Sequence, residues 1–445
     1  MDFFRRLAAL WRTRPFRQIV LLRLFAQGGD AALQVGMAAY LLLNPQTQPN
    51  GLSIAFAMTI MVLPFSLVGP FISPILDRFA RTQIVLVSDI CRVILSLAMG
   101  VLVLCQLTTG AGQVTLFVLL LVALSINRLQ LAAISAGLPL AIGDDEYVEA
   151  MSVVPMIGPA SAVLAGIVGG GLRLALADSW PAHRADALVF ALAAILFTLA
   201  IIMSLRMDRH ALGPTVVTRS SMSAAFRSIW DAVLGLRQRP IAAQGILTQT
   251  LSRHAWGALT VLAILVFRQH FNTGNLNVAI LGLGGWFAVS GVGFAVSGAL
   301  AGPLVTKAGL RKGLIILLCA SAIIQLLPAL WLHPLTMIVS GFGLGLTVQS
   351  VKACCDTLVQ AHTDDEMRGR VMVGYDIANN LGFAVGALIA GALLPADGDS
   401  PLTLVVIAGW YLAIALLVTR LSASHRAAYE RGTSGFAADP RGDQH

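Results

Sequence analysis

The sequence predicts an all-α membrane protein that crosses the bilayer many times. Of its 445 residues, 57% are hydrophobic and only 12% are charged, which is about half the charged fraction of an ordinary soluble protein. Twelve apolar stretches follow one another along the chain, each about 20 residues or longer, the length needed to cross a hydrocarbon core. Every stretch must be helical, because unpaired backbone groups are too costly in lipid.

The expected spans lie near residues 18–43, 52–76, 83–107, 113–138, 150–176, 185–206, 240–267, 279–305, 313–333, 335–359, 370–394 and 402–421. The first span is too long for a cleaved signal sequence and has no small-residue cleavage site after a short apolar core. We therefore interpret it as the first permanent helix.

The distribution of basic residues predicts the orientation in the membrane. The segments expected on one side hold 22 of the 30 Lys and Arg, whereas those on the other side hold only Arg173, Arg184 and Arg268. This positive-inside pattern predicts that both termini are cytoplasmic, and we expect a multi-pass protein of the cell membrane. The net charge of +8 then reflects topology and attraction to anionic lipid head groups. It does not indicate a nucleic-acid partner.

The longest loop divides the chain into two halves. We expect a basic cytoplasmic N-terminus (1–17), a six-helix bundle (18–206), a cytoplasmic linker (207–239), a second six-helix bundle (240–421) and a cytoplasmic tail (422–445). The second part of the linker, AAFRSIWDAVLGLRQR, combines an apolar face with basic flanks. That pattern is typical of a helix lying on the inner membrane surface.

The two halves repeat each other weakly. SPILDRFAR (73–81) follows the second span and GPLVTKAGLRK (302–312) follows the eighth, and DDE occurs at 144–146 and again at 364–366. When Asp77 is aligned with Thr306, Arg78 aligns with Lys307. Internal repetition of this kind is typical of transporters built around a central site.

The stretch after the second span resembles the loop motif of the major facilitator superfamily, roughly G-x-x-x-D-R-x-G-R-R/K. It retains Asp77, Arg78 and Arg81 but has Ser73 and Ala80 in place of glycines. The second copy retains these members of the motif: Gly302, Lys307, Gly309, Arg311 and Lys312. The resemblance covers nearly the whole chain, and SDICR (88–92) and DDEMRGRVMVGYD (364–376) are similar to the drug- and siderophore-exporter branch. It implies two pseudo-symmetric six-helix bundles.

The resemblance also implies a charged network at the cytoplasmic gate. We infer that Arg78 pairs with Asp89, and that Asp77 faces the start of the eleventh span, where Arg370 and the positive end of a helix dipole lie. The residues assigned to this gate are Asp77, Arg78, Asp89, Arg92, Arg370 and Asp376. A cavity role is the alternative for Asp376. The alternative for the motif charges is that they only fix topology.

A polar face interrupts the first span. In RLFAQGGDAALQ (23–34), the spacing of Arg23, Gln27, Asp30 and Gln34 places all four side chains on one side of a helix. Asp30 is the candidate proton carrier, because a carboxyl at membrane depth is drawn towards its neutral form. The alternative is a permanent ion pair with a buried arginine.

Other spans carry ionisable residues too. Arg128 lies in the fourth span, Arg253 in the seventh, and Lys352 and Asp356 in the tenth, one turn apart and able to form a static pair. The resemblance implies that the first, fourth, seventh and tenth spans line a central cavity. We therefore predict a substrate and proton pathway along the following residues: Arg23, Gln27, Asp30, Gln34, Arg128, Arg253, Lys352 and Asp356.

The fifth span, PMIGPASAVLAGIVGGG, is rich in glycine. Gly158-Pro159 can bend a helix. Gly166 and Gly170 form a small-xxx-small face, which favours close helix packing.

Several activities leave no trace in the sequence. It contains no G-x-x-x-x-G-K-[ST], no H-E-x-x-H and no CxxC pair, so we expect no ATPase, no metal site and no enzyme activity. The energy source that we expect is the proton gradient, with no cofactor. The expected partners are a small-molecule substrate, protons and membrane lipids, and the expected oligomeric state is a monomer.

Together, these features predict a secondary active transporter that exports amphipathic small molecules by alternating access, in exchange for protons. A proton-linked importer of a small solute or lipid-like molecule remains an alternative. A second is a sensor or scaffold of the same fold that moves no substrate. The sequence leaves open the substrate and its charge, the direction of transport and the stoichiometry.

Overall fold

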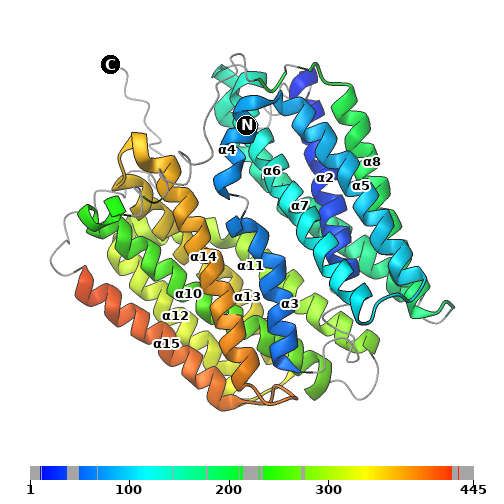
Figure 1. Ribbon diagram of the computed structural model, residues 1–445. Helices are drawn as coiled ribbons and strands as arrows, with labels where there is room; N and C mark the ends of the chain where they lie inside the picture. The colour runs from blue at the N-terminus through cyan, green and yellow to red at the C-terminus, as the bar shows by residue number, and fades with distance from the viewer. Residues whose placement is uncertain are drawn as a thin grey trace. The chain divides into compact units, whose positions relative to one another are not determined.

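The structure, a computed structural model, describes residues 13–37, 50–67, 69–142, 144–176, 179–209, 211–213, 234–271 and 276–422, together with Trp11, Trp230 and Tyr429. The first half contains α2 (Arg14–Met37), α3 (Gly51–Leu67), α4 (Gly69–Arg78), α5 (Arg81–Leu104), α6 (Ala111–Ala141), α7 (Asp144–Ala175) and α8 (Ala182–Leu205). The second half contains η2 (Leu236–Gln238), α10 (Pro240–Leu265), η3 (Val266–His270), α11 (Leu276–Ala308), α12 (Leu310–Leu330), α13 (Pro334–Ala361), α14 (Asp365–Leu393) and α15 (Pro401–Leu421) (Figure 1).

The prediction of an all-α membrane protein is confirmed. Each expected span overlaps a helix, and the second is divided between α3 and α4. Within the described part of the chain, nine helices are long and apolar enough to cross a membrane. Several helices extend past the predicted limits, as α6 and α11 do. Hydropathy locates the limits of an apolar stretch only approximately, whereas backbone hydrogen bonding determines where the helix ends.

The chain forms two compact units. One comprises Met1–Gln48 and Leu63–Phe226, and the other comprises Pro49–Val62 and Arg227–His445. The first part of α3 therefore belongs with the second unit, where it approaches α14 closely. A Cβ atom added to Gly391 would lie 2.6 Å from the carbonyl oxygen of Gly51. The predicted amphipathic linker helix falls largely outside the described residues, although Trp230 within it is exposed.

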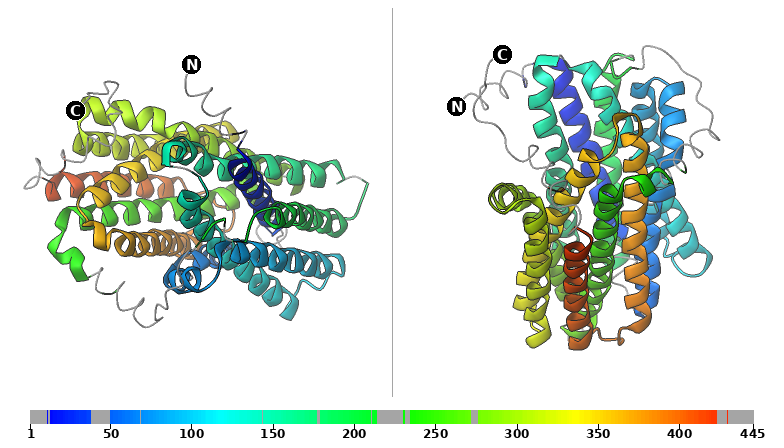
Figure 2. Two further views of the ribbon diagram at one scale, coloured as in Figure 1. Left: turned by 90° about the horizontal axis from the view of Figure 1, so that it is seen from above. Right: turned by 90° about the vertical axis from the view of Figure 1, so that its left-hand side faces the viewer.

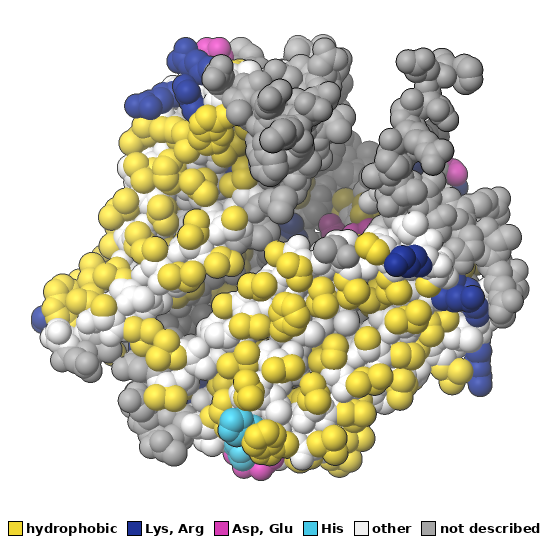
Figure 3. Space-filling view, turned by 180° about the vertical axis from the view of Figure 1, so that it is seen from behind, with side chains coloured by type: hydrophobic (Ala, Val, Ile, Leu, Met, Phe, Trp, Pro, Cys, Tyr) yellow, Lys and Arg dark blue, Asp and Glu magenta, His cyan; other side chains and the backbone are white. Residues whose placement is uncertain are grey.

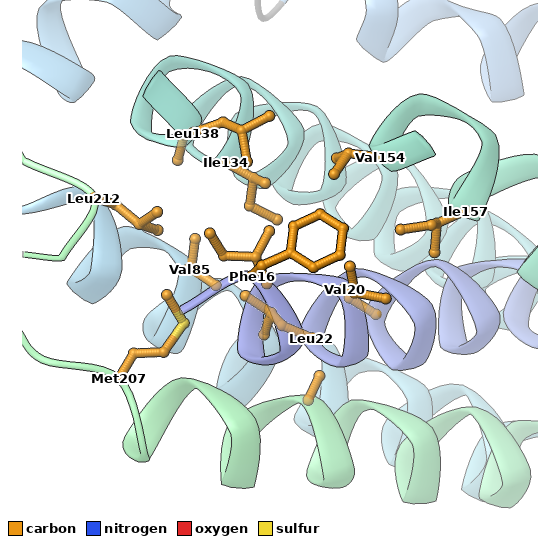
Figure 4. Packing of buried hydrophobic residues seen from close by; sticks show 14 of the residues in the cluster. Phe16, Val20, Leu22, Val85, Ile134, Leu138, Val154, Ile157, Met207 and Leu212 are labelled. Carbon is orange, nitrogen blue, oxygen red and sulfur yellow. The ribbon is translucent and has the colours of Figure 1, made fainter. Parts of the chain in front are cut away.

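The first unit is organised around the start of α2. In Figure 4, the Phe16 ring from α2 lies among aliphatic side chains of α6 and α7, including Ile134 and Val154. Met207 and Leu212, which follow α8, complete the same buried cluster. This core fixes the first part of α2 against its neighbours, so that the polar face further along the helix is held in a defined position.

The helices of the second unit approach each other through small residues. Gly345 of α13 lies against α11, where an added Cβ atom would stand 2.1 Å from the carbonyl oxygen of Ser290. Gly386 of α14 approaches the carbonyl oxygen of His254 in α10 as closely, at 2.0 Å. Small residues at these positions allow backbones to pack directly, which is how helices associate in lipid. Figure 2 shows the helices of each unit running side by side.

Gly345→Ala is expected to destabilise the protein by about 1–3 kcal/mol, since the new methyl group forces α11 and α13 apart. Gly284→Ala is the matched control, because an added Cβ atom at Gly284 meets nothing within 4 Å. Both changes raise helix propensity equally. Thermal unfolding of the purified proteins measures the difference, and equal midpoints for the two variants would contradict this packing.

The outer surface of each unit is apolar. Large hydrophobic side chains such as Leu164, Ile323 and Leu393 are more than half exposed. Figure 3 shows hydrophobic side chains spread over the described parts of the visible face, with Lys and Arg mostly near its edges. An apolar surface of this extent is suited to contact with lipid.

Candidate functional site

A buried polar network joins α2 and α6 in the first unit. Asp30 of α2 is 4% exposed. Its Oδ2 atom accepts hydrogen bonds from the side-chain amides of Gln34, at 2.7 Å, and Asn127, at 2.9 Å. Its Oδ1 atom accepts none from the residues that the structure describes. Two donors therefore hold Oδ2 in place, and Oδ1 still has its hydrogen-bonding capacity.

Asn127 connects this carboxyl group to a cation. Its Oδ1 atom accepts hydrogen bonds from Gln27 of α2, at 3.0 Å, and from the guanidinium of Arg92 in α5, at 3.3 Å. Asn127 thus stands between Asp30 and Arg92. The charges of Arg92 and Arg128 act on Asp30, whereas its hydrogen bonds from the described residues come from side-chain amides.

Arg92 has its own carboxylate. It forms an ion pair with Asp89 at 2.5 Å, and both side chains are completely buried. Gln130 of α6 donates a hydrogen bond to Asp89 at 2.8 Å and accepts one from Arg92. The Phe197 ring of α8 covers the guanidinium, 4.4 Å from its carbon. Gln130 and the Phe197 ring therefore enclose the Arg92–Asp89 pair.

This geometry corrects the inferred pair between Arg78 and Asp89. Arg78 is exposed at the end of α4, whereas Asp89 binds Arg92 and Gln130. The i,i+3 spacing lets Arg92 reach Asp89 within one helix. The side chain of Asp77 lies outside the described residues. Its predicted neighbour Arg370 is exposed on α14, and so is Asp376, another residue assigned to the gate.

The polar face of α2 is divided. Gln27, Asp30 and Gln34 enter the network, whereas Arg23 is partly buried and its Nε atom has no partner among the described residues. Gly29 lies on the opposite side, where an added Cβ atom would stand 2.8 Å from the Phe197 ring. Glycine there brings α2 close to α8.

The second unit carries a separate cluster on α10, α13 and α14. Lys352 and Asp356 form the expected one-turn pair at 2.6 Å, with side chains 30% and 27% exposed. The Lys352 ammonium lies 5.6 Å from the centre of the Tyr375 ring. Arg253 stands over the Phe383 ring, 5.3 Å from its centre. This cluster contains the Lys352–Asp356 pair and a second cation, Arg253.

The predicted glycine packing on the fifth span is wrong in its positions. α7 continues from Asp144 to Ala175 through Gly158 and Pro159. Added Cβ atoms at Gly158 and Gly166 would lie 3.8 and 3.9 Å from α2 side chains, which is ordinary contact, and one at Gly170 meets nothing within 4 Å. Among the described residues, a methyl group fits at each of these positions without a clash.

Two arginines of the loop motifs bind polar groups near the ends of other helices. Arg81 donates hydrogen bonds to the carbonyls of Ala136, at 2.7 Å, and Leu212, at 3.2 Å. Arg311 donates to the hydroxyl of Ser422 at 2.5 Å, at the end of α15. These contacts give both arginines a structural role.

Gln130 was not predicted from the sequence as a member of the network, although it lies one turn after Asn127 on α6. Within the described residues, no group of three or more His, Cys, Asp or Glu side chains could hold a metal ion.

The helical fold and the polar clusters at membrane depth are those of a membrane transporter. The nucleoside transporter NupG has the same fold, with a TM-score of 0.69 at 10% identity over 92% of this chain and 100% of that chain. A D-xylose-proton symporter matches with a TM-score of 0.65 at 14% identity, over 90% and 95% of the two chains. At these identities the likeness shows the fold alone.

Sequence comparison identifies the family. The family model described as Major Facilitator Superfamily matches residues 245–438. Uncharacterised MFS-type transporters of Mycobacterium bovis and Mycobacterium tuberculosis are each 31% identical over 419 residues, which is 91% of both chains. The MFS-type transporter YfiS of Bacillus subtilis is 24% identical over 354 residues, covering 78% of this chain and 80% of YfiS.

The chain therefore belongs to the Major Facilitator Superfamily, as its loop motifs predicted. It is a multi-pass membrane protein whose fold supports secondary transport of small molecules by alternating access. Members of this family are transporters and in general are not enzymes.

Proposed function

We propose that this protein is a proton-coupled exporter of amphipathic small molecules, and that Asp30 is its proton carrier. The observation that supports the proposal is the setting of Asp30. Two amide groups orient one oxygen of the carboxyl group and leave the other without a donor. A proton can therefore bind Oδ1 while both existing hydrogen bonds are kept.

The two buried carboxylates of the first unit differ in a way that favours this role. Asp89 binds a guanidinium directly, so protonating it would leave Arg92 as an uncompensated buried charge. Among the described residues, Asp30 accepts hydrogen bonds only from neutral amides, and its protonation removes a buried charge instead. The static-pair alternative for Asp30 calls for a direct bond to a cation, whereas the donors to Asp30 among the described residues are the amides of Gln34 and Asn127.

The proposal also includes a substrate class and an energy source. An exporter of amphipathic molecules agrees with the resemblance to the drug- and siderophore-exporter branch and with the aromatic and cationic cluster near Arg253. The proton gradient supplies the energy. Asp77, Arg78, Arg370 and Asp376 remain the predicted gate, and Arg23, Arg128, Lys352 and Asp356 remain predicted members of the pathway.

Everted membrane vesicles with an acidic lumen test this function. A lumenal pH-sensitive dye is followed while a panel of amphipathic compounds is added outside, with vesicles lacking the protein as control. An antiporter exporter moves substrate inwards and protons outwards in this orientation, so the lumen becomes less acidic. A symporter importer running in reverse makes the lumen more acidic. A scaffold that transports nothing gives no signal with any compound.

A further inference from the structure

Arg253 of α10 carries a positive charge that no carboxylate of the described residues pairs with. Among the described residues, none forms an ion pair with it, and its Nε atom has no hydrogen-bond partner. The titratable groups that act on it are the phenols of Tyr375 and Tyr411, which are neutral near pH 7. The side chain is only partly buried, so part of it stays accessible.

Two other cations within predicted spans, one in α5 and one in α13, do have carboxylate partners. Arg92 binds Asp89, and Lys352 binds Asp356. A cation within a membrane span is expensive and is typical of a binding or transport pathway. Because α10 is the seventh predicted span, Arg253 also lies on an element expected to line the central cavity.

The local geometry leaves the donors of Arg253 free to bind an anion. The Phe383 ring supports the guanidinium from one side at 5.3 Å, which holds the group in position without using its N–H donors. A guanidinium presents these donors as a fork that matches a carboxylate or a phosphate. The neighbouring cation, Lys352, is already neutralised, which favours a ligand with a single anionic group.

We propose that Arg253 binds the anionic group of the substrate, so that the transported molecules are amphipathic acids carrying a carboxylate or a phosphate. This inference rests on the transport function proposed above and names its substrate class. Phe383 acts as a positioning residue, because it orients the guanidinium.

The test compares ligands that differ in charge and share one skeleton. Full-length protein in lipid nanodiscs is titrated calorimetrically with 1-naphthaleneacetate and with the neutral 1-naphthaleneacetamide. We expect the acid to bind at least about 10-fold more tightly, as charge-assisted hydrogen bonds do. 1-Naphthyl phosphate is a third ligand, and its affinity relative to the acetate shows which anion the site prefers.

Variants assign the preference to one residue. Arg253→Gln is expected to reduce the acid-to-amide affinity ratio to about 1, while Arg253→Lys retains part of it because the charge remains. Lys312→Gln removes a positive charge from an exposed position on α12 and should leave the ratio unchanged. The wild-type ratio is informative even if Arg253→Gln fails to fold.

Equal binding of acid and amide by the wild type, or binding of neither anion, would overturn the inference. An unchanged ratio in folded Arg253→Gln would do so as well. The nanodiscs carry no proton gradient, so the ratio is independent of proton coupling. If the wild type shows no preference for the acid over the amide but still gives the lumenal pH signal in vesicles, only the substrate class is rejected. If it prefers the acid but gives no pH signal, only the proton coupling is rejected.

Discussion

Asp30→Asn is expected to abolish proton-driven transport and to preserve substrate exchange. Asparagine has nearly the shape of aspartate, and its carbonyl oxygen can accept the hydrogen bonds of Gln34 and Asn127. It cannot take up a proton. The variant should therefore bind substrate and change conformation, but the imposed gradient should no longer drive accumulation above equilibrium.

Two measurements on proteoliposomes separate these steps. Accumulation driven by a pH gradient should fall to the level of liposomes without protein, whereas exchange of labelled for unlabelled substrate should persist within about tenfold of the wild type. Asp30→Glu retains a carboxyl group and should recover part of the accumulation. Accumulation at the wild-type level in Asp30→Asn would place the proton carrier elsewhere.

Arg92→Met is expected to lower the free energy of unfolding by about 3–5 kcal/mol, the usual cost of removing one partner from a buried ion pair. The change leaves the Asp89 carboxylate buried without its cation, and Gln130 alone cannot compensate the charge. Thermal unfolding in detergent measures the loss.

The double change Asp89→Leu with Arg92→Met should recover most of that stability, since it removes both charges and keeps a similar volume. A double-mutant cycle with the two single variants gives the coupling energy. A single-variant loss below about 1 kcal/mol, typical of exposed pairs, would show that the pair is not the closed structural unit described above.

Periodicity predicted the faces of single helices well. The spacing along α2 correctly grouped Gln27, Asp30 and Gln34, and the one-turn spacing in α13 correctly paired Lys352 with Asp356. Both are contacts within one helix, and helical geometry alone determines them.

Contacts between helices were beyond such reasoning. Asn127 binds Asp30 from 97 residues away, and nothing in either local pattern specifies that pairing. The loop motif predicted Arg78 as the partner of Asp89, whereas Arg92 on the same helix forms the ion pair. The prediction for α7 failed for a similar reason: a glycine pattern shows where two helices can approach, and only the packing shows where they do. A close approach of two helix backbones occurs at Gly345 of α13, whereas Gly166 of α7 makes an ordinary contact.

The central claim is that movement of substrate is tied to movement of protons through Asp30. The most direct test uses liposomes that contain only this protein and an internal pH dye, with no proton gradient imposed. A substrate gradient is applied, and lumenal pH and labelled substrate are followed together. The account predicts a pH change opposite in direction to substrate flow in the wild type, and none in Asp30→Asn. Substrate flow without any pH change in the wild type would contradict it.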